Sequence, residues 1–328
     1  MLRRYFIIIF LIALTITIGC SAESKETSGE GNFPKKDIEF IAPASPGGGW
    51  DSTARAMQKI LIDEEIIEEN ISVINKPGGN GEVGWQFLKG KDAHVVAMNS
   101  SLIITNHLLD QSELTFEDFT PLAILTTEWP TVTISSESDL ETGTDVMEQL
   151  KKDPKSLKIG VEPGLGSDAH LAFVQAAQEE DVDVSQLEYL IYDGGGDLVT
   201  ALLGGHVDVA ATELSKVKEH YLAEKFNIVA IASEERVKDL EDVQTWEEQG
   251  VDVIFPHWRG IIGPPNMSDE EINYWDEKME EMAETEGWNE VLDNNEWETF
   301  YKSSSESKEF LAEQTEHYDE LLKLSGLK

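Results

Sequence analysis

The chain has 328 residues, of which 64 are acidic and 25 are basic, so its formal net charge is −39. Such an acidic chain would repel phosphate backbones, which argues against a nucleic-acid-binding protein. The length suggests about two domains, and a hydrophobic content of 40% allows a sizeable core.

The N-terminus has the pattern of a secretory signal peptide. Arg3 and Arg4 precede an almost unbroken apolar run over 5–18, which is too short for a comfortable membrane span. Cys20 follows this run and is the single cysteine of the chain, so no internal disulfide can form. We therefore expect residues 1–19 to be removed as a signal peptide.

The position of Cys20 is similar to that of the lipid-carrying cysteine of bacterial lipoproteins, although Thr17 stands where leucine is usual. The alternative is an ordinary signal peptide that happens to contain a cysteine. Residues 20–36 are polar and lack aliphatic periodicity, which predicts a disordered tether. We expect a lipid on Cys20 that anchors the protein to the outer face of the cell membrane.

The first regular elements are a strand over 38–42, a Pro/Gly loop and a helix that runs to about Glu69. Asp51 or Ser52 is expected to cap this helix. Free N–H groups at a helix start can hold an anion, and glycines let a ligand approach the main chain. The patterns of nucleotide-binding loops are absent. The alternative for this loop is a tight connection without a ligand.

The same order recurs along the chain. A strand over 71–75 leads through the glycine-rich residues 76–81 into a helix, and a third strand covers 95–99. Residues 118–125 lead into 131–134, a strand or crossover toward a second domain. Alternation of strands, loops and helices is typical of parallel α/β sheets, whose ligands lie beyond the carboxyl ends of the strands.

The second domain repeats this pattern. A helix over 144–151 precedes strands over 157–161, 188–192, 207–211 and 228–232, and glycine-rich loops follow the first two of these strands. Ser167 or Asp168 is expected to cap the helix after the first loop. The chain returns to the first domain at 255–263, and two amphipathic helices end it.

Several of these segments together resemble the substrate-binding component of tripartite tricarboxylate transporters, the TctC or Bug family of extracytoplasmic solute receptors. The resemblance rests on segments that occur in family order: 46–55, 75–81, 164–171, 192–196, 202–208 and 258–260. It implies a periplasmic-binding-protein-like α/β fold with two lobes, crossover strands and a ligand cleft between them. The expected lobes are 33–130 with 255–328, and 131–254.

The resemblance also implies a ligand and its contacts. Family ligands are mostly carboxylates, which the receptor delivers to a separate membrane permease; we expect a monomer that needs no cofactor and no metal. The ligand-binding residues expected from it are Ser45, Gly47, Gly48, Gly49, Trp50, Asp51, Gly78, Gly79, Asn80, Gly81, Gly166, Ser167, Asp168, Tyr192, Asp193, Gly194, Gly195 and Arg259. Departures from the family pattern at 77–81 and 205–208 leave the identity of the ligand open.

Backbone N–H groups of the glycine-rich loops would hold one carboxylate, with hydroxyl groups as further donors. Arg259 is the candidate cationic contact, and its alternative is a structural ion pair. Ser167, Asp168 and His170 offer catalytic residue types, but neighbours on a helix start do not face one another, so we expect no enzyme. A receptor that presents its ligand to a membrane sensor kinase is the alternative function.

Overall fold

The computed structural model describes residues 33–192 and 194–328. The expected signal peptide, Cys20, most of the expected tether and Asp193 lie outside the described residues. Pro34–Lys328 forms one compact unit. No helix in the described part of the chain is long and apolar enough to cross a membrane.

One sheet of six described strands has the order β11-β4-β10-β3-β1-β2. Its strands are β1 (Ile38–Ala42), β2 (Ile71–Asn75), β3 (Val95–Asn99), β4 (Thr120–Glu128), β10 (His257–Gly263) and β11 (Glu298–Lys302). Strand β1 is parallel to β2 and β3, whereas β10 is antiparallel to β3 and β4. Strand β3 is buried throughout and is apolar up to Asn99, and β4 is buried from Leu122 to Glu128, as is usual for central strands that are covered on both faces.

A second sheet of five described strands has the order β7-β6-β8-β5-β9. Its strands are β5 (Pro130–Ser135), β6 (Ile159–Val161), β7 (Tyr189–Ile191), β8 (Val209–Glu213) and β9 (Phe226–Ile231). Strand β6 is parallel to β7 and β8, and β5 is antiparallel to β8 and β9.

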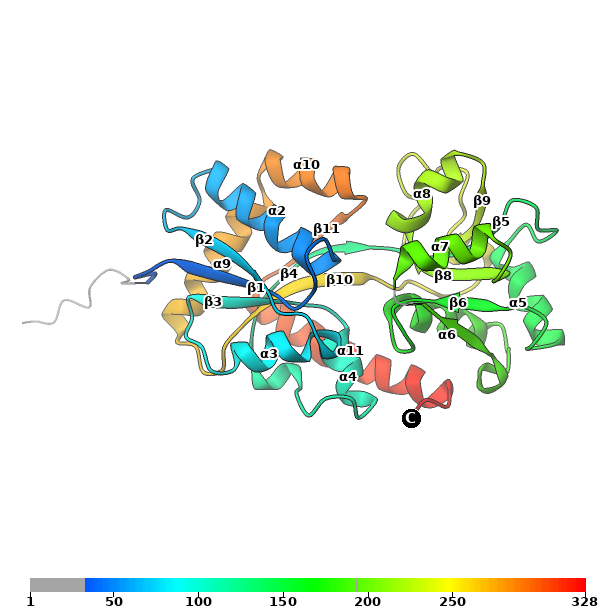
Figure 1. The fold of residues 1–328 in the computed structure, drawn as a ribbon, viewed down its shortest axis with the longest axis horizontal. Helices are drawn as coiled ribbons and strands as arrows, with labels where there is room; N and C mark the ends of the chain where they lie inside the picture. Colours follow the sequence, from blue (N-terminus) through cyan, green and yellow to red (C-terminus); the bar gives the residue numbers. More distant parts are fainter. Residues whose placement is uncertain (1–32, 193) are drawn as a thin grey trace, which may run out of the picture. The chain divides into compact units, whose positions relative to one another are not determined.

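The chain passes between the two sheets twice. Strand β4 ends at Glu128 and β5 begins at Pro130, so Trp129 alone separates a strand of the first sheet from a strand of the second. After β9 the chain returns to the first sheet as β10 (Figure 1). Two α/β sheets joined by crossover strands confirm the predicted periplasmic-binding-protein-like fold class.

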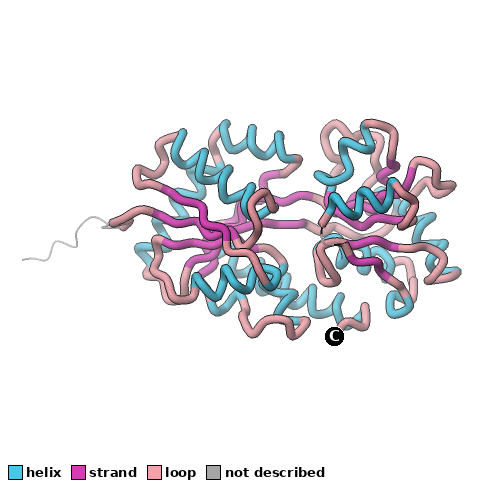
Figure 2. The backbone as a smooth tube through the Cα atoms, in the orientation of Figure 1, coloured by secondary structure: helices cyan, strands magenta, loops and turns pink. Residues whose placement is uncertain are grey.

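Helices cover both sheets (Figure 2). Those that follow strands of the first sheet, or come after the return, are α2 (Gly49–Asp63), η1 (Gly79–Gly81), α3 (Glu82–Leu88), α4 (Leu102–Leu108), η2 (Phe116–Asp118), α9 (Asp269–Ala283), α10 (Glu286–Asn295) and α11 (Ser304–Leu324). Those of the second sheet are α5 (Gly143–Lys152), α6 (Asp168–Glu179), η3 (Val184–Gln186), α7 (Gly195–Leu203), α8 (Leu214–Leu222) and η4 (Glu247–Gln249).

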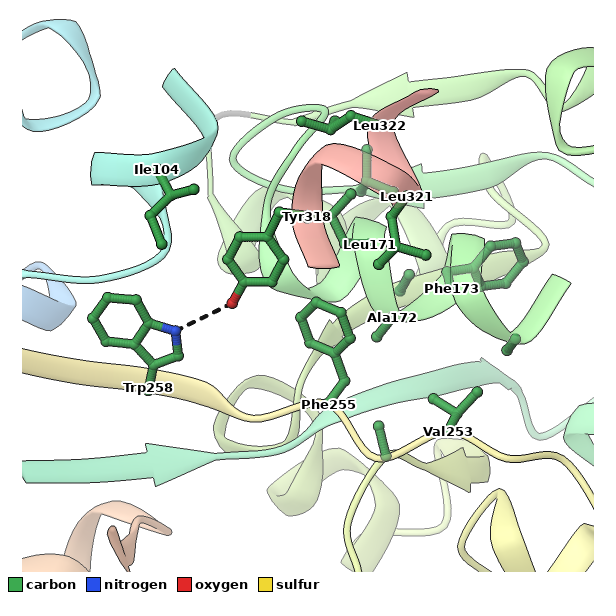
Figure 3. Close-up of a cluster of buried hydrophobic side chains, with 14 of the residues drawn as sticks. Ile104, Leu171, Ala172, Phe173, Val253, Phe255, Trp258, Tyr318, Leu321 and Leu322 are labelled. Atoms are coloured by element: carbon green, nitrogen blue, oxygen red, sulfur yellow. Dashed lines mark hydrogen bonds between the residues drawn. The ribbon is translucent and has the colours of Figure 1, made fainter. Parts of the chain in front are cut away.

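The end of the C-terminal helix α11 packs against α6 of the second sheet. Tyr318 stacks on Phe255 with ring centroids 5.7 Å apart, and Nε1 of Trp258 donates a 3.1 Å hydrogen bond to the hydroxyl of Tyr318 (Figure 3). Leu321 and Leu171 belong to the same buried cluster. A shared core therefore joins elements of the two sheets.

Three local expectations were wrong. The first helix ends at Asp63 and not near Glu69, because Glu65 adopts a left-handed conformation (φ 55°) and the chain turns inward to bury Ile66. Its N-cap is Gly48, so Asp51 lies in the first turn. Between the two expected C-terminal helices the structure has a further helix, α10, and a strand, β11.

Candidate functional site

A cavity of about 190 Å³ lies where strand ends of the two sheets meet. Ala44 follows β1, Ser100 follows β3, Glu128 ends β4, and Glu213 ends β8. The lining residues are Ala44, Gly49, Trp50, Ser100, Leu102, Glu128, Glu162, Pro163, Glu213, Lys216, His257 and Arg259. A larger hollow of about 360 Å³ is lined by elements of the first sheet alone, at η2, β4, α9 and α11. Because ligands of α/β sheets bind beyond the carboxyl ends of strands, the cavity between the sheets is the candidate site.

An ion pair between Arg259 and Glu128 forms one wall of this cavity. The two residues lie on neighbouring strands, β10 and β4, and both are buried. A Cβ at position 49 would lie 3.3 Å from Nε of Arg259, so the glycine lets the first loop approach the guanidinium closely. The predicted alternative for Arg259, a structural ion pair, is therefore present in the structure.

The charge of Glu128 is stabilised by its neighbours. Burial alone would raise the pKa of Glu128, but the positive charges of Arg259, His257 and Lys216 outweigh this effect and lower the pKa to about 2. The nearby hydroxyl of Ser215 makes a further, smaller contribution that lowers the pKa of Glu128. Glu128 is therefore ionised at neutral pH.

Both members of this ion pair keep an unsatisfied atom. Nη1 of Arg259 and Oε2 of Glu128 are buried and have no hydrogen-bond partner among the described residues. Burial of polar atoms without partners is unfavourable and is uncommon in folded proteins. Both residues line the cavity, but these two atoms themselves have almost no accessible surface.

Two further carboxyl groups, those of Glu162 and Glu213, lie on the side of the five-stranded sheet. Glu162 directly follows β6, and its Oε1 accepts a 3.0 Å hydrogen bond from the hydroxyl of Thr212. Burial, together with the neighbouring carboxyl groups of Glu162 and Glu128, raises the pKa of Glu213 well above its usual value. Glu213 therefore holds its proton at a pH where an exposed glutamate is ionised.

Asp168 connects the first turn of α6 to elements of the first sheet. Its Oδ2 lies 2.6 Å from Nδ1 of His257 and accepts a 2.8 Å hydrogen bond from Ser101. Its Oδ1 accepts a 3.3 Å hydrogen bond from the hydroxyl of Tyr318. The residue is 1% exposed. Its carboxylate thus holds the two sheets together beside the cavity.

Of the two residues predicted as the cap of α6, the structure has Ser167, whose hydroxyl accepts a hydrogen bond from the N–H of His170.

Asp51 shapes the loop before α2. Its carboxylate accepts hydrogen bonds from the N–H of Gly47 at 2.8 Å and from Nδ2 of Asn75 at 2.8 Å, and pairs with Arg55. Burial opposes ionisation, yet these three partners lower the pKa of Asp51 to about 2. A charged side chain therefore fixes the glycine-rich loop that carries Gly49.

The structure brings some of the predicted site residues to the cavity. Gly49, Trp50 and Arg259 line it, and a Cβ at Gly195 would lie 2.8 Å from Lys216 and 3.2 Å from Glu162, so Gly195 is adjacent. Predicted residues that do not line this cavity are Ser45, Gly47, Gly48, Asp51, Gly78, Gly79, Asn80, Gly81, Gly166, Ser167, Asp168, Tyr192 and Gly194. Asp193 lies outside the described residues. The direct ligand contacts of all these residues stay predictions.

Most of the charged residues that line the cavity were not predicted from the sequence. Glu128, Glu213, Lys216 and His257 were not predicted as site residues, and Glu162 was noted only as part of a loop. Three of these residues are glutamates at the carboxyl ends of buried strands, where a charge is uncommon. A glutamate that ends an apolar run was the signal that could have revealed them.

Metal binding finds no support in the described part of the chain, where no group of three or more His, Cys, Asp or Glu side chains could hold a metal ion. The carboxyl groups at the cavity are instead paired with Arg259, Thr212 and His257.

The fold and the cavity between two α/β sheets define a solute-binding protein of the periplasmic type. The sequence matches the family described as "Tripartite tricarboxylate transporter family receptor" over residues 53–327. The chain therefore belongs to this receptor family, as its motifs predicted, and the family is one of receptors and not of enzymes.

Individual relatives agree with this assignment. A UPF0065 protein of Pseudomonas sp. (strain P51) is 25% identical over 71% of this chain and 69% of its own length. Protein BugT of Bordetella pertussis is 25% identical over 71% of this chain and 72% of its own length.

Solved structures share the fold. A TctC solute-binding protein from Polaromonas has a TM-score of 0.75 at 24% identity, with 89% of this chain and 99% of that chain covered. MatC from Rhodopseudomonas palustris, solved with bound malate, has a TM-score of 0.73 at 17% identity over 88% of this chain and all (100%) of that one. An R. palustris protein solved with adipate has a TM-score of 0.76 at 16% identity over 90% of this chain and 98% of that one.

Proposed function

We propose that this protein is an extracytoplasmic solute-binding lipoprotein that captures a small organic acid and delivers it to the permease of a tripartite tricarboxylate transporter. Its two lobes, 33–130 with 255–328 and 131–254, would close over the ligand by a hinge motion. The malate and adipate bound to two structural neighbours support a carboxylate as the ligand class.

One observation carries the proposal for the site: the guanidinium of Arg259 lines the cavity beside Gly49, where a Cβ would lie 3.3 Å from its Nε. A ligand carboxylate would bind at this guanidinium. A hydrogen bond to a charged group contributes roughly 1.5–3 kcal/mol, and the planar guanidinium suits a carboxylate. Gly49 and Gly195 would let the ligand approach the main chain at the starts of α2 and α7.

This design explains how a chain of net charge −39 can bind an anion. Salt screens exposed charges beyond about 8–10 Å at physiological ionic strength. The guanidinium of Arg259 and the N–H groups at the helix starts act inside the cavity, where screening is much weaker. Repulsion by the distant acidic surface is therefore a small effect in comparison.

The proposal is tested by the melting temperature of the protein in a series of organic acids that includes malate, succinate and adipate. A ligand that binds the folded state alone stabilises the protein and so raises its melting temperature. The added free energy of unfolding is about 2.7 kcal/mol when the ligand concentration is a hundred times its Kd. We expect at least one acid to do so, and Arg259→Met to abolish the shift. Arg236→Met, at an exposed ion pair with Glu248 in the loop after β9, is the control that should keep it. A shift with sugars and with no acid would refute the carboxylate class.

The anchor and the transport role need separate measurements. If Cys20 carries the lipid, the wild-type protein fractionates with membranes and Cys20→Ser is released as soluble protein. If the receptor serves a transporter, deletion of the neighbouring permease genes abolishes ligand uptake in cells. Loss of a transcriptional response with unchanged uptake would instead support the sensor-kinase alternative.

A further inference from the structure

Two lysine side chains lie against a single phenylalanine on the surface of the first lobe. Nζ of Lys76, which follows β2, is 3.8 Å from the centroid of the Phe87 ring, and Nζ of Lys91 is 4.0 Å from the same centroid. Phe87 lies on α3, and Lys91 follows that helix. Attraction between an ammonium group and the face of an aromatic ring helps to hold both lysines in place. Two positive charges are therefore kept close together although they repel each other.

These lysines and Lys35 form what we call the lysine patch: Lys35, Lys76 and Lys91. Within the described part of the chain, none of the three forms an ion pair, whereas Lys36 and Lys89 both pair with aspartates. Lys35 and Lys91 are exposed. In a chain with 64 acidic and 25 basic residues, most cations can find a carboxylate. The lysine patch is therefore available to an anion outside the protein.

The lysine patch lies beside the point where the N-terminal residues enter the described part of the chain. The N–H of Lys35 donates a 2.9 Å hydrogen bond to Nε2 of His94, and Lys36 pairs with Asp92 at 2.8 Å. Asp92 directly follows Lys91 in the chain. Strands β1 and β3 are parallel neighbours, so their starts lie at the same end of the sheet (Figure 1).

The proposed lipid on Cys20 would bring this end of the molecule near a membrane. Residues 21–32 separate Cys20 from the described part of the chain. A segment of this length spans at most about 40 Å when it is fully extended. The lysine patch lies where that segment ends, so it can reach the membrane surface, where phospholipid head groups carry phosphates.

We propose that the lysine patch contacts the phosphates of anionic phospholipids and holds one face of the first lobe toward the membrane. The inference rests on the proposed lipid anchor, because a few lysines bind such a surface too weakly to anchor a protein alone. The net charge of −39 does not prevent this contact. Salt screens exposed charges beyond about 8–10 Å at physiological ionic strength, so the groups nearest the head groups dominate.

The single cysteine allows a test in which the protein is anchored. The chain from Cys20 onward, coupled through its thiol to a maleimide-bearing lipid in vesicles, contains the whole compact unit Pro34–Lys328. Energy transfer from its tryptophans to dansyl-labelled lipids reports how close the protein lies to the membrane; all tryptophans except Trp246 lie in the first lobe. We expect more transfer on vesicles of phosphatidylglycerol and phosphatidylcholine in equal parts than on vesicles of phosphatidylcholine alone.

Two double variants remove the same charge from different lobes. Lys76→Gln with Lys91→Gln should abolish the increase in transfer, because the acidic protein is then mainly repelled by the anionic vesicles. Lys158→Gln with Lys225→Gln is the matched control and should keep the increase. Both control lysines are exposed, lie on the second lobe and form no ion pair among the residues that the structure describes. Melting temperatures measured alongside check that each variant keeps its fold.

Each outcome decides the proposal. Equal or lower transfer on the anionic vesicles for the wild type overturns the lipid contact. It leaves the lipid on Cys20 and the binding of organic acids standing, since fractionation and the melting-temperature shift measure those separately. An equal loss in both double variants would show a general effect of charge and overturn the assignment to the lysine patch. Unchanged transfer in Lys76→Gln with Lys91→Gln, together with lost ligand uptake in cells, would assign the patch to the permease and overturn the lipid as its partner.

Discussion

Nδ1 of His257 lies 2.6 Å from Oδ2 of Asp168, and this contact joins strand β10 of the first sheet to the first turn of α6 on the second. The carboxylate also holds Ser101 and Tyr318, so one side chain connects three elements of the first sheet to the second. The same histidine lines the cavity. The site and the joint between the lobes are therefore parts of one hydrogen-bonded network.

Removal of this carboxylate should destabilise the protein. Asp168→Ala leaves buried donors of His257 and Ser101 without an acceptor, and loss of one partner of a buried charged pair costs about 3–5 kcal/mol. We expect a loss of about 3 kcal/mol in the free energy of unfolding, measured by urea denaturation. Glu179→Ala, at the exposed end of α6, is the control and should change it by less than about 0.5 kcal/mol. A loss below about 1 kcal/mol for Asp168→Ala would show that the network does not stabilise the fold.

Glu213 should give a pH-dependent effect. Its pKa is raised in the folded state, so the native protein binds more protons than the unfolded chain above the ordinary glutamate pKa. Stability from this group is complete below about pH 4.5 and falls as the pH rises, by at most about 1.4 kcal/mol per pH unit. Glu213→Gln mimics the protonated form and removes this loss.

We therefore expect Glu213→Gln to melt at a higher temperature than the wild type at pH 8, and the difference to disappear near pH 4.5. Calorimetric scans across this pH range measure it. Glu219→Gln, exposed on α8, should show a small difference that does not change with pH. A difference for Glu213→Gln that is the same at both pH values would contradict the raised pKa.

The cavity can be blocked without replacing any charged group. Gly49 has ordinary backbone angles and lies against the guanidinium of Arg259, where a Cβ would be 3.3 Å from Nε. A leucine side chain at this position would fill the space in front of Arg259. We expect Gly49→Leu to fold with a similar melting temperature and to lose at least tenfold in ligand affinity by calorimetry. Gly90→Leu, with open space around its Cβ position, should bind like the wild type.

Much of the fold could be predicted from the sequence, because strands, glycine-rich loops and helices alternate in a pattern that is typical of parallel sheets. The crossover was also foreseen, since the β-rich segments on either side of Trp129 lie close together in the chain. The pattern failed at the C-terminus, where the short strand β11 reads as part of a helix-rich region. Its pairing with β4 is a long-range contact that local sequence does not reveal.

The site was predicted only in part, for a physical reason. Glycine-rich loops at strand ends can be recognised locally, and Gly49, Trp50 and Arg259 do line the cavity. Glu128, Glu162 and Glu213 come from different strands of two sheets and become one acidic group only after folding. The pKa values of Glu128 and Glu213 depend on this assembly, so no local sequence pattern reveals it. The predicted backbone clamp for a carboxylate stays a prediction.

The joint between the lobes also depends on apolar packing. Leu321 of α11 is 3% exposed and shares its cluster with Leu171 of α6 (Figure 3), whereas Leu324, one turn further along, is 38% exposed. We expect Leu321→Ala to lower the free energy of unfolding by about 2–5 kcal/mol, as is usual for a buried leucine, and Leu324→Ala to lower it by less than about 1 kcal/mol. Urea denaturation of both variants measures the difference. Equal effects would mean that the end of α11 does not pack on α6 in solution, and the two lobes would then be held by the crossover strands and Asp168 alone.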